Sequence, residues 1–423
     1  MNIYATLILA TLVLSFLLSA ITEYLNLRAL NSTLPPEFKD VYSEEKYARS
    51  QEYTRVRSRF GLLSGAFGLA LLLGFWFMRG FEHLDQYLRA LDLHPIITGV
   101  LFIGLLVLGR GLLGLPFRLY SVFVIEKKFG FNRTTPGVFV MDMFKGLALA
   151  GILGTPILAL ILAFFYYAGP LAWLYCWGAV IAFSLLTQFI APTWIMPLFN
   201  KFTPLPEGDL RTAIMNMARD LNFSLTNIFV IDGSKRSTKS NAFFTGFGRN
   251  KRIALYDTLV ENHTTEELTA VLAHEIGHYK EKHILKGMLM SFVQTGMVFA
   301  LLSVFLTHRG LYDAFFMSEM SLYAGLVFFG LLYSPLDLIL SVLGSVISRK
   351  HEFEADRYAA RVSRDPEAMV NALKKLSAHN LSNLSPHRWY VFLNYSHPPV
   401  LERIKAIRAL ASAKAAPDPA TAV

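Results

Sequence analysis

Seven long apolar stretches limit what this chain can fold into more than any other feature does. A membrane-spanning α-helix needs about 20 mostly apolar residues, and seven segments meet that requirement: 3–21, 60–78, 95–115, 146–168, 171–195, 287–307 and 322–347. The 423-residue chain is 53% hydrophobic and only 17% charged, so it has too few polar residues to coat several soluble domains. We therefore predict an all-α polytopic membrane protein, with seven transmembrane helices embedded in a lipid bilayer.

The distribution of Lys and Arg predicts which side of the membrane each loop faces. The N-terminus and the second, fourth and sixth loops contain only Arg79, Arg89 and Arg309, whereas nearly all the rest of the 40 Lys and Arg lie on the opposite side. Because cytoplasmic loops concentrate Lys and Arg, the basic side should be cytoplasmic. The net charge of +9 is then typical of basic loops beside anionic lipid, and we expect no nucleic-acid partner.

Two ionisable residues, Arg110 and Asp337, fall inside predicted spans. A charge at membrane depth usually faces the interior of a helix bundle or a wet cavity. A structural ion pair, or a side chain that reaches the membrane surface, is the alternative. The sequence leaves the roles of both residues open.

The loop between the fifth and sixth spans contains the motif that indicates chemistry. Thr264, followed three residues later by Glu267, has the pattern of a capping box and predicts a helix start. Inside that helix His274 and His278 are four residues apart, so they share one face and can hold one metal ion. Glu275 follows the first histidine, where a general base for a metal-activated water belongs. The alternative is a solvated helix with two idle histidines, although chance predicts only about 0.01 such motifs in the chain.

A third metal ligand must come from elsewhere, because a hydrolytic zinc site usually has three protein ligands and an open position for water. Just after the last span, Glu352 and Asp356 are four residues apart and share a helix face. Glu352 could bind the metal while Asp356 orients one of the ligands; His351 is a rival ligand. At helical rise, Glu352 and His278 lie roughly 7–13 Å beyond the ends of their spans. The metal should therefore lie near the headgroups of the cytoplasmic leaflet.

These residues and the seven spans together resemble the integral-membrane zinc CAAX prenyl endopeptidase family, type 1, whose members are gluzincin-type proteases. The resemblance covers nearly the whole chain and extends to VIEK at 124–127, GFN at 130–132, PTW at 192–194, PLFN at 197–200, SNAFFTG at 240–246 and NYSHPP at 394–399. One departure is Glu354, which stands where eukaryotic members tend to have Gln. The compact length is typical of a bacterial member, which would lie in the inner membrane; a eukaryotic one would lie in the endoplasmic reticulum membrane.

The resemblance implies a site and a substrate. His274, His278 and Glu352 would bind one Zn²⁺ per chain, Glu275 would activate water, and Asp356 would support the ligands from behind. The seven helices would form a barrel around an intramembrane chamber, with the active site at its cytoplasmic end. The substrate would be a protein whose C-terminal Cys bears an isoprenoid, and its last three residues would be removed.

Short strands near the motif could hold a substrate. We predict strands at 227–232 and 252–256, with 240–248 between them, where Gly246 and Gly248 fit a turn or bulge. Zinc proteases commonly hold the scissile chain extended against an edge strand, and the resemblance places Asn241 and Ala242 on that edge. An ordinary sheet segment is the alternative.

Two further polar residues lie near the C-terminus. His397 precedes two prolines and a predicted helix that contains Arg403. Amide hydrolysis builds negative charge on the carbonyl oxygen, which a nearby His or Arg can stabilise. The resemblance implies that His397 and Arg403 do this or order the site; a structural cap or a surface ion pair is the alternative. We interpret His283 as an interface residue rather than a ligand.

The predicted organisation has five parts. Residues 1–195 form transmembrane helices 1–5 with amphipathic cytoplasmic loops, 196–286 a cytoplasmic α+β protease portion, 287–348 helices 6 and 7, 349–410 C-terminal catalytic helices, and 411–423 a disordered tail. The predicted function is a zinc endopeptidase acting near the C-terminus of CAAX-type proteins. The alternatives are a membrane-protein quality-control metalloprotease without a prenyl requirement, and a non-catalytic metal-binding scaffold or transporter.

Overall fold

The computed structural model describes all residues except 224, 226, 246–251, 364 and 416–423. Within the described residues, seven helical segments are long and apolar enough to cross a membrane, which confirms the predicted number of spans. They are α1 (Ile3–Arg28), α2 (Glu44–Phe77), α4 (Pro95–Tyr120) with its extension to Glu126, α5 (Pro136–Leu149) joined to α6 (Thr155–Tyr167), α7 (Ala172–Ile190) within Gly169–Leu198, α11 (His283–Phe305) and α13 (Leu322–Val362).

Several spans contain an irregular turn. Residues Ser121–Glu126, Ala150–Gly154 and Ala191–Ile195 are π-helical. Pro156 follows the second of these turns and Pro192 lies in the third. A proline removes one backbone donor, and a π-turn is a common way to accommodate the resulting bend. Pro335 lies within α13, which runs on without an interruption.

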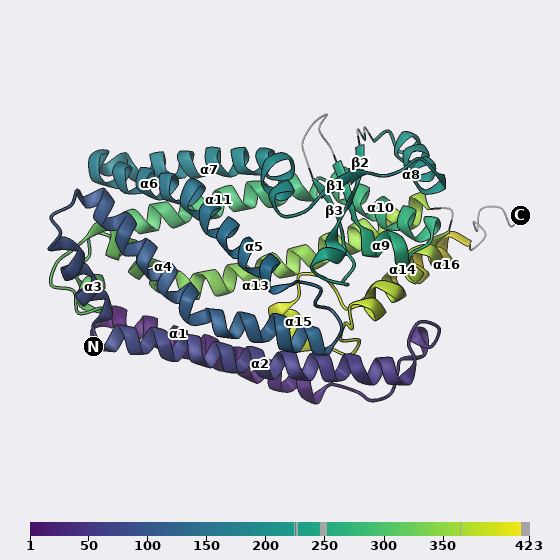
Figure 1. Ribbon diagram of the computed structural model, residues 1–423, viewed down its shortest axis with the longest axis horizontal. Coiled ribbons are helices and arrows are strands. Elements are labelled where there is room, and N and C mark those ends of the chain that lie inside the picture. Colours follow the sequence, from purple (N-terminus) through teal and green to yellow (C-terminus); the bar gives the residue numbers. More distant parts are fainter. Residues whose placement is uncertain (224, 226, 246–251, 364, 416–423) are drawn as a thin grey trace, which may run out of the picture.

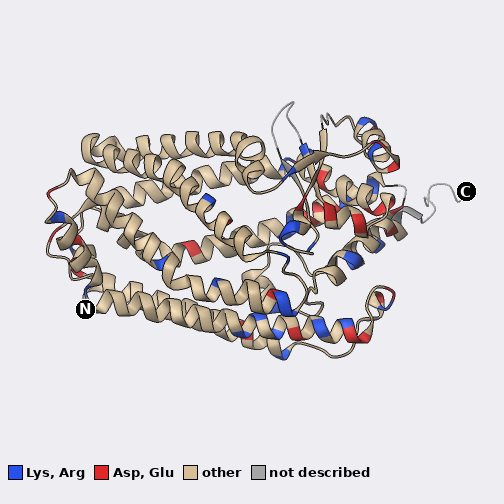
Figure 2. Ribbon diagram, viewed as in Figure 1, with Lys and Arg blue, Asp and Glu red and all other residues tan. Residues whose placement is uncertain are grey.

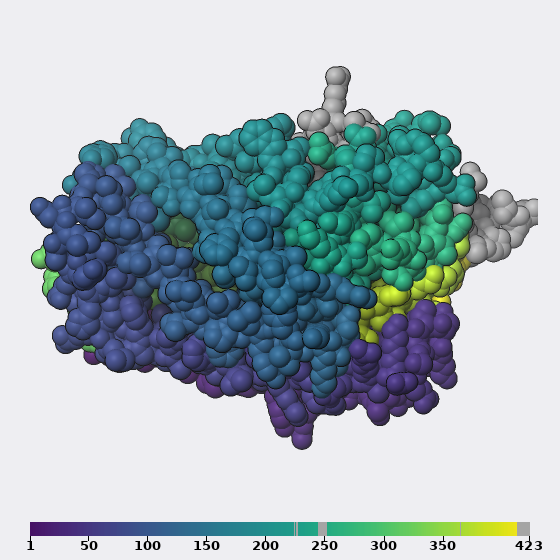
Figure 3. Space-filling view, viewed as in Figure 1, coloured from purple at the N-terminus to yellow at the C-terminus, as the bar shows by residue number. Residues whose placement is uncertain are grey.

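The spanning helices run lengthwise around the middle of the molecule (Figure 1). Only 6–22% of the residues in their most apolar windows are buried. Packed bundles bury one face of each helix, so this low share is typical of helices that face lipid on one side and a hollow on the other. Figure 3 shows gaps between the front helices through which more distant helices are visible. Arg110 and Asp337 are both exposed, and no ion pair joins them among the described contacts.

The two ends of the molecule differ in charge. The end near the N-terminus has the short helices α3 (Gly80–Arg89) and α12 (Arg309–Asp313), and most charged residues gather at the other end (Figure 2). Stacked rings of Trp76, Phe315 and Phe328 form part of a buried aromatic core near α3. The Trp76 indole N–H also donates to the Ala314 carbonyl at 2.8 Å. The sparsely charged end is thus closed by a packed core, and the chemistry-bearing residues lie at the charged end.

A small sheet lies at the charged end. Among the described residues its strand order is β1 (Phe202–Pro204), β2 (Asn227–Ile231), β4 (Arg252–Tyr256) and β3 (Ala242–Thr245). Strands β2 and β4 are parallel and the other two pairs are antiparallel. Both predicted strands are confirmed, and so is the α+β character of this portion. The predicted turn at Gly246 and Gly248 lies outside the described residues.

The sheet packs against α10 (Thr265–Lys280) through an apolar core. Ile253 and Leu255 on β4 contact this core together with Leu268 and Leu272 on α10. Helices α8 (Asp209–Asp220) and α9 (Asp257–Asn262) complete it. Burying these side chains stabilises the sheet by about 1.5–3 kcal/mol per large aliphatic residue. The opposite side of α10 remains available for other helices.

The C-terminal helices pack around that opposite side. They are α14 (Pro366–His379), α15 (Arg388–Asn394) and α16 (Val400–Ala415). Ala270 on α10, Ala360 on α13, Val370 on α14 and Ile404 on α16 belong to one buried cluster. Helix α16 continues to Ala415, so the first five residues of the predicted tail, 411–415, are helical, and the rest of that tail, 416–423, lies outside the described residues.

Candidate active site

Helix α10 begins with the predicted capping box. The Thr264 hydroxyl accepts from the Glu267 backbone N–H at 3.3 Å, and the Glu267 carboxylate accepts from the Thr264 N–H at 3.0 Å. This reciprocal cap satisfies two donors that the helix start would otherwise leave unpaired. Two and a half turns further on, His274 and His278 project from the same face, with their Nε2 atoms 3.1 Å apart.

Helix α13 brings the predicted third ligand to the two imidazoles. The Glu352 carboxylate lies 3.5 Å from His274 Nε2 and 3.3 Å from His278 Nε2. One ligand atom from each of the three residues lies within 4.8 Å of the other two. The span of α13 continues beyond the membrane as one unbroken helix, so Glu352 reaches the α10 motif without a loop. The convergence of these segments was the central expectation from the sequence.

The chemistry of this donor set fits a divalent cation. Two imidazoles and one carboxylate are typical ligands of hydrolytic zinc sites. The Glu352 side chain is 6% exposed, and its Oε2 atom makes no hydrogen bond to a described residue, although the Arg403 guanidinium lies 3.3 Å from it. The two facing Nε2 atoms cannot both present lone pairs to each other favourably, whereas a cation between them would satisfy both. The arrangement is therefore better suited to a bound ion than to an internal hydrogen-bond network.

Asp356 and Arg403 contact the candidate metal ligands on the side away from the facing Nε2 atoms. Asp356 Oδ1 accepts a hydrogen bond from His274 Nδ1 at 2.9 Å, which leaves the Nε2 lone pair free for a metal. The Arg403 guanidinium donates two hydrogen bonds to Asp356, at 2.8 and 2.7 Å, and lies 3.3 Å from Glu352. Burial by itself would lower the pKa of Arg403, but the Asp356 carboxylate beside it raises that pKa above the usual value.

Glu275 occupies the position expected of a base. It is enclosed by the site, and this burial raises the pKa of its carboxyl above the usual range, although the neighbouring His274 and His278 oppose the shift. A carboxyl whose pKa moves toward the working pH is a better proton acceptor and donor in turn. Among the described residues, the group of side chains that could hold a metal ion includes His274, His278 and Glu352 but not Glu275.

The structure gives His397 and Arg403, for which the sequence predicted the same role, different surroundings. His397 is 64% exposed; its Nε2 atom lies 3.4 Å from Glu352, and its Nδ1 atom is 3.0 Å from the Ser396 hydroxyl. Arg403 is 9% exposed and bonded to the carboxylates. Of these two residues His397 is the exposed one, whereas the contacts of Arg403 favour the ordering role over contact with an oxyanion.

The predicted substrate strand is at the edge of the sheet. Strand β3 pairs only with β4 among the described strands, so its outer edge has no neighbouring strand there. Ala242 opens β3, and Asn241 precedes it, with its carbonyl accepting from the Tyr256 N–H at 3.1 Å. The Asn241 side chain accepts from the Ala242 N–H at 2.9 Å. An ordinary edge strand and a substrate-binding edge share this geometry.

Sequence reasoning missed a cavity beside the site. A cavity of about 490 Å³ is lined by His397 and Arg403 and by Asn380, Asn383 and Tyr395. Asn380 also connects this wall to the sheet, because its amide exchanges hydrogen bonds with the Ser240 backbone at 3.2 and 3.3 Å. Isolated asparagines in a helix end and a loop give no sequence signal, so only the fold could reveal them.

The close crossing of α10 and α13 leads to a testable prediction. A Cβ added at Gly277 would lie 3.2 Å from the Ala355 Cα and carbonyl oxygen. Gly277→Val should therefore push α10 away from α13, cost about 1–3 kcal/mol of stability and weaken metal retention. Gly287→Val on α11 is the matched control, since a Cβ there meets no described atom within 4 Å. Thermal unfolding in detergent and metal content would measure both effects; equal behaviour of the two variants would contradict the prediction.

Fold and site together define a membrane-embedded metallopeptidase. Two family descriptions match the chain: "CAAX prenyl protease N-terminal, five membrane helices" over residues 23–201 and "Peptidase family M48" over residues 204–411. The chain belongs to this family, the M48 peptidases of the CAAX prenyl protease 1 type. It is accordingly a metalloendopeptidase, and the family resemblance inferred from the sequence is confirmed.

Similar proteins cover nearly the full length. A CAAX prenyl protease 1 homolog of Oryza sativa is 36% identical over 96% of this chain and 97% of its own. The CAAX prenyl protease 1 of Saccharomyces cerevisiae is 36% identical over 88% of both chains, and the Homo sapiens homolog is 33% identical over 89% of both. The crystal structure of S. mikatae Ste24p has a TM-score of 0.90 at 34% identity, covering 96% of this chain and 99% of that one. The predicted helical barrel is thereby confirmed.

Proposed function

We propose that this protein is a zinc endopeptidase that cleaves near the C-terminus of CAAX-type proteins whose terminal Cys is prenylated. The main supporting observation is that His274, His278 and Glu352 converge within 4.8 Å beside Glu275, at the charged end of a membrane barrel. Relatives that cover almost the whole chain are named CAAX prenyl proteases, which supports the substrate class.

Each residue of the site has a separate task in this proposal. His274, His278 and Glu352 would hold the ion. A zinc ion held there would supply a Lewis acid for hydrolysis of the scissile amide. Glu275 takes a proton from the water that attacks the scissile carbonyl carbon and passes that proton to the leaving amine. Its buried carboxyl, with a raised pKa, suits both transfers.

The remaining residues bind and orient. His397, exposed beside Glu352, donates a hydrogen bond to the carbonyl oxygen as negative charge develops there. Arg403 acts through Asp356 and Glu352, because it is buried behind them. Asn241 and Ala242 align the substrate backbone with the outer edge of β3, which no other described strand pairs with, so that main-chain hydrogen bonds set which bond is cut.

We further propose that the active site faces the cytoplasm. The site lies at the end of the molecule where Lys and Arg gather (Figure 2), and cytoplasmic loops are enriched in these residues. In a bacterial cell this end would face inward from the inner membrane. In a eukaryotic cell it would face outward from the endoplasmic reticulum.

Cleavage of matched peptides tests the proposed function. The purified protein in detergent should cleave a farnesylated peptide ending in Cys-aliphatic-aliphatic-X after the Cys, and cleave the non-farnesylated peptide much more slowly. A strong chelator should abolish cleavage, and added Zn²⁺ should restore it. Equal turnover of the two peptides would favour a quality-control protease without lipid specificity. Cleavage that survives complete metal removal would rule out the metallopeptidase mechanism.

A further inference from the structure

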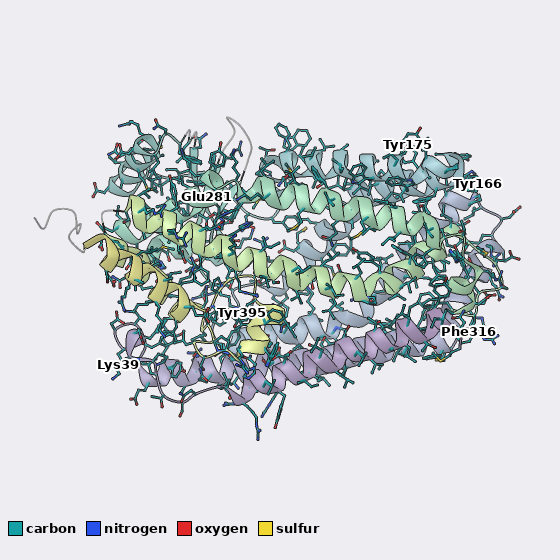
Figure 4. The ribbon with its side chains drawn as sticks, turned by 180° about the vertical axis from the view of Figure 1, so that it is seen from behind. Lys39, Tyr166, Tyr175, Glu281, Phe316 and Tyr395 are labelled. Carbon is teal, nitrogen blue, oxygen red and sulfur yellow. The ribbon has the colours of Figure 1, made fainter. Side chains whose placement is uncertain are left out.

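A second cluster of polar side chains lies next to the metal ligands. His283 at the start of α11 and His351 and Glu354 on α13 place one ligand-type atom each within 4.8 Å of one another. His283 is 6% exposed. Lys282 has a left-handed backbone (φ 58°), which turns the chain sharply from α10 into α11 and places His283 beside His278. Figure 4 shows this corner, marked by Glu281, near the C-terminal part of α13.

The geometry of this cluster does not suit a metal ion. The His283 and His351 rings are stacked, with centroids 3.9 Å apart and planes at 13°. Imidazole lone pairs lie in the ring plane, so those of two parallel rings do not converge on an ion about 2.0–2.1 Å from each nitrogen. Both nitrogens of His283 also have other close partners: His278 on one side and Glu354 on the other.

Metal binding at His278 would determine every proton in this chain of contacts. His278 Nε2 faces Glu352 and His274, so it must offer its lone pair to an ion bound there. His278 Nδ1 then bears the proton and donates to His283 Nδ1, 3.0 Å away. The proton of neutral His283 is therefore on Nε2, which donates to Glu354 Oε2 at 2.9 Å.

We propose that His283 and Glu354 are positioning residues that fix the tautomer and ring orientation of His278 through this hydrogen-bonded relay. His351 acts only by stacking on the His283 ring. The inference rests on the proposed metal binding by His274, His278 and Glu352, and not on the identity of the substrate. With this relay, each of the two histidine ligands has a carboxylate behind it: Asp356 contacts His274 directly, and Glu354 acts on His278 through the imidazole of His283.

The relay has a physical reason in this fold. His278 lies near the end of α10, and no carboxylate of α13 contacts its Nδ1 atom directly among the described residues. The tight corner at Lys282 brings an imidazole into that gap, and the negative charge of Glu354 makes the whole chain a better acceptor. Partners behind a metal ligand typically change metal affinity about 10–100-fold.

Metal release from the full-length protein in detergent tests the relay. Zinc-loaded protein is mixed with a chromophoric chelator, and the release rate is measured for His283→Phe, Glu354→Ala and Glu354→Gln. We expect about 10–100-fold faster release for His283→Phe and Glu354→Ala. Glu354→Gln keeps an acceptor oxygen without the charge, and should fall between these variants and the wild type. The double variant His283→Phe/Glu354→Ala should release zinc no faster than His283→Phe alone, because Glu354 acts through His283.

His351→Phe is the matched control, because it preserves an aromatic ring against His283 and removes both nitrogens. Its zinc release should stay within about threefold of the wild type, and the visible spectrum of its cobalt-substituted form should be unchanged. In contrast, His283→Phe should shift that spectrum, which mere loss of packing would not do. If Glu354→Ala released zinc at the wild-type rate, that result would overturn the relay. So would a second equivalent of bound zinc that His351→Phe removes. Neither result depends on peptide turnover, so failure here is distinguishable from failure of the proposed prenyl specificity.

Discussion

Replacing Glu275 with Gln should leave the metal bound and remove peptide cleavage. Glu275 is adjacent to the ligand His274 in sequence, but the convergent ligand group contains His274, His278 and Glu352 instead. The amide of Gln has the same shape as the carboxylate and cannot accept a proton at neutral pH. A positioned base contributes about 10²–10⁴-fold to a rate, so cleavage should fall by at least that range. Elemental analysis and a peptide-cleavage assay on the same preparation would measure both quantities.

Glu266→Gln is the matched control for this experiment. Glu266 is in the first turn of the same helix, and its side chain is exposed and remote from the ligands. That variant should retain both zinc and cleavage. If Glu275→Gln still cleaved at the wild-type rate, the base would have to be another residue. If it lost zinc along with activity, Glu275 would instead be part of the ligand set or essential for its shape.

The features that the sequence could predict depend on short-range periodicity. The spans follow from runs of about 20 apolar residues. His274 and His278 share a face because any helix repeats about every 3.6 residues. Glu352 was within reach because the last span ends close to it, so the distance along one rigid helix was calculable. The capping box at Thr264 was equally local, and the structure contains both of its hydrogen bonds.

The features that the sequence could not predict depend on contacts between remote segments. His283 was interpreted as an interface residue, because nothing local shows that a left-handed Lys282 would turn it toward His278. Arg403 was grouped with His397 as a possible oxyanion partner. Its burial follows from the packing of α16 against α13 and α14, which only the assembled core determines. The same holds for the cavity wall at Asn380, where α14 meets the sheet.

Arg403→Ala should be the most destabilising single change at the site. The side chains of Arg403 and Asp356 are 10% and 1% exposed, and Glu352 lies beside them at 6%. Removing the guanidinium leaves two buried carboxylates without their main positive partner. Breaking a buried ion pair in this way costs about 3–5 kcal/mol, so the thermal unfolding midpoint in detergent should fall markedly. Metal retention should also weaken, because Asp356 would no longer be held against His274.

Arg408→Ala on the same helix tests whether the stabilising effect of Arg403 depends on its burial or only on its charge. Arg408 makes the same two-pronged contact with Glu367, at 2.8 and 2.9 Å, but these side chains are 43% and 50% exposed. An exposed pair is typically worth about 0–1 kcal/mol, because water replaces the lost partner. The Arg408→Ala midpoint should therefore stay close to that of the wild type. If both variants unfolded at the same temperature, burial of the Arg403–Asp356–Glu352 group would not be what stabilises the metal site.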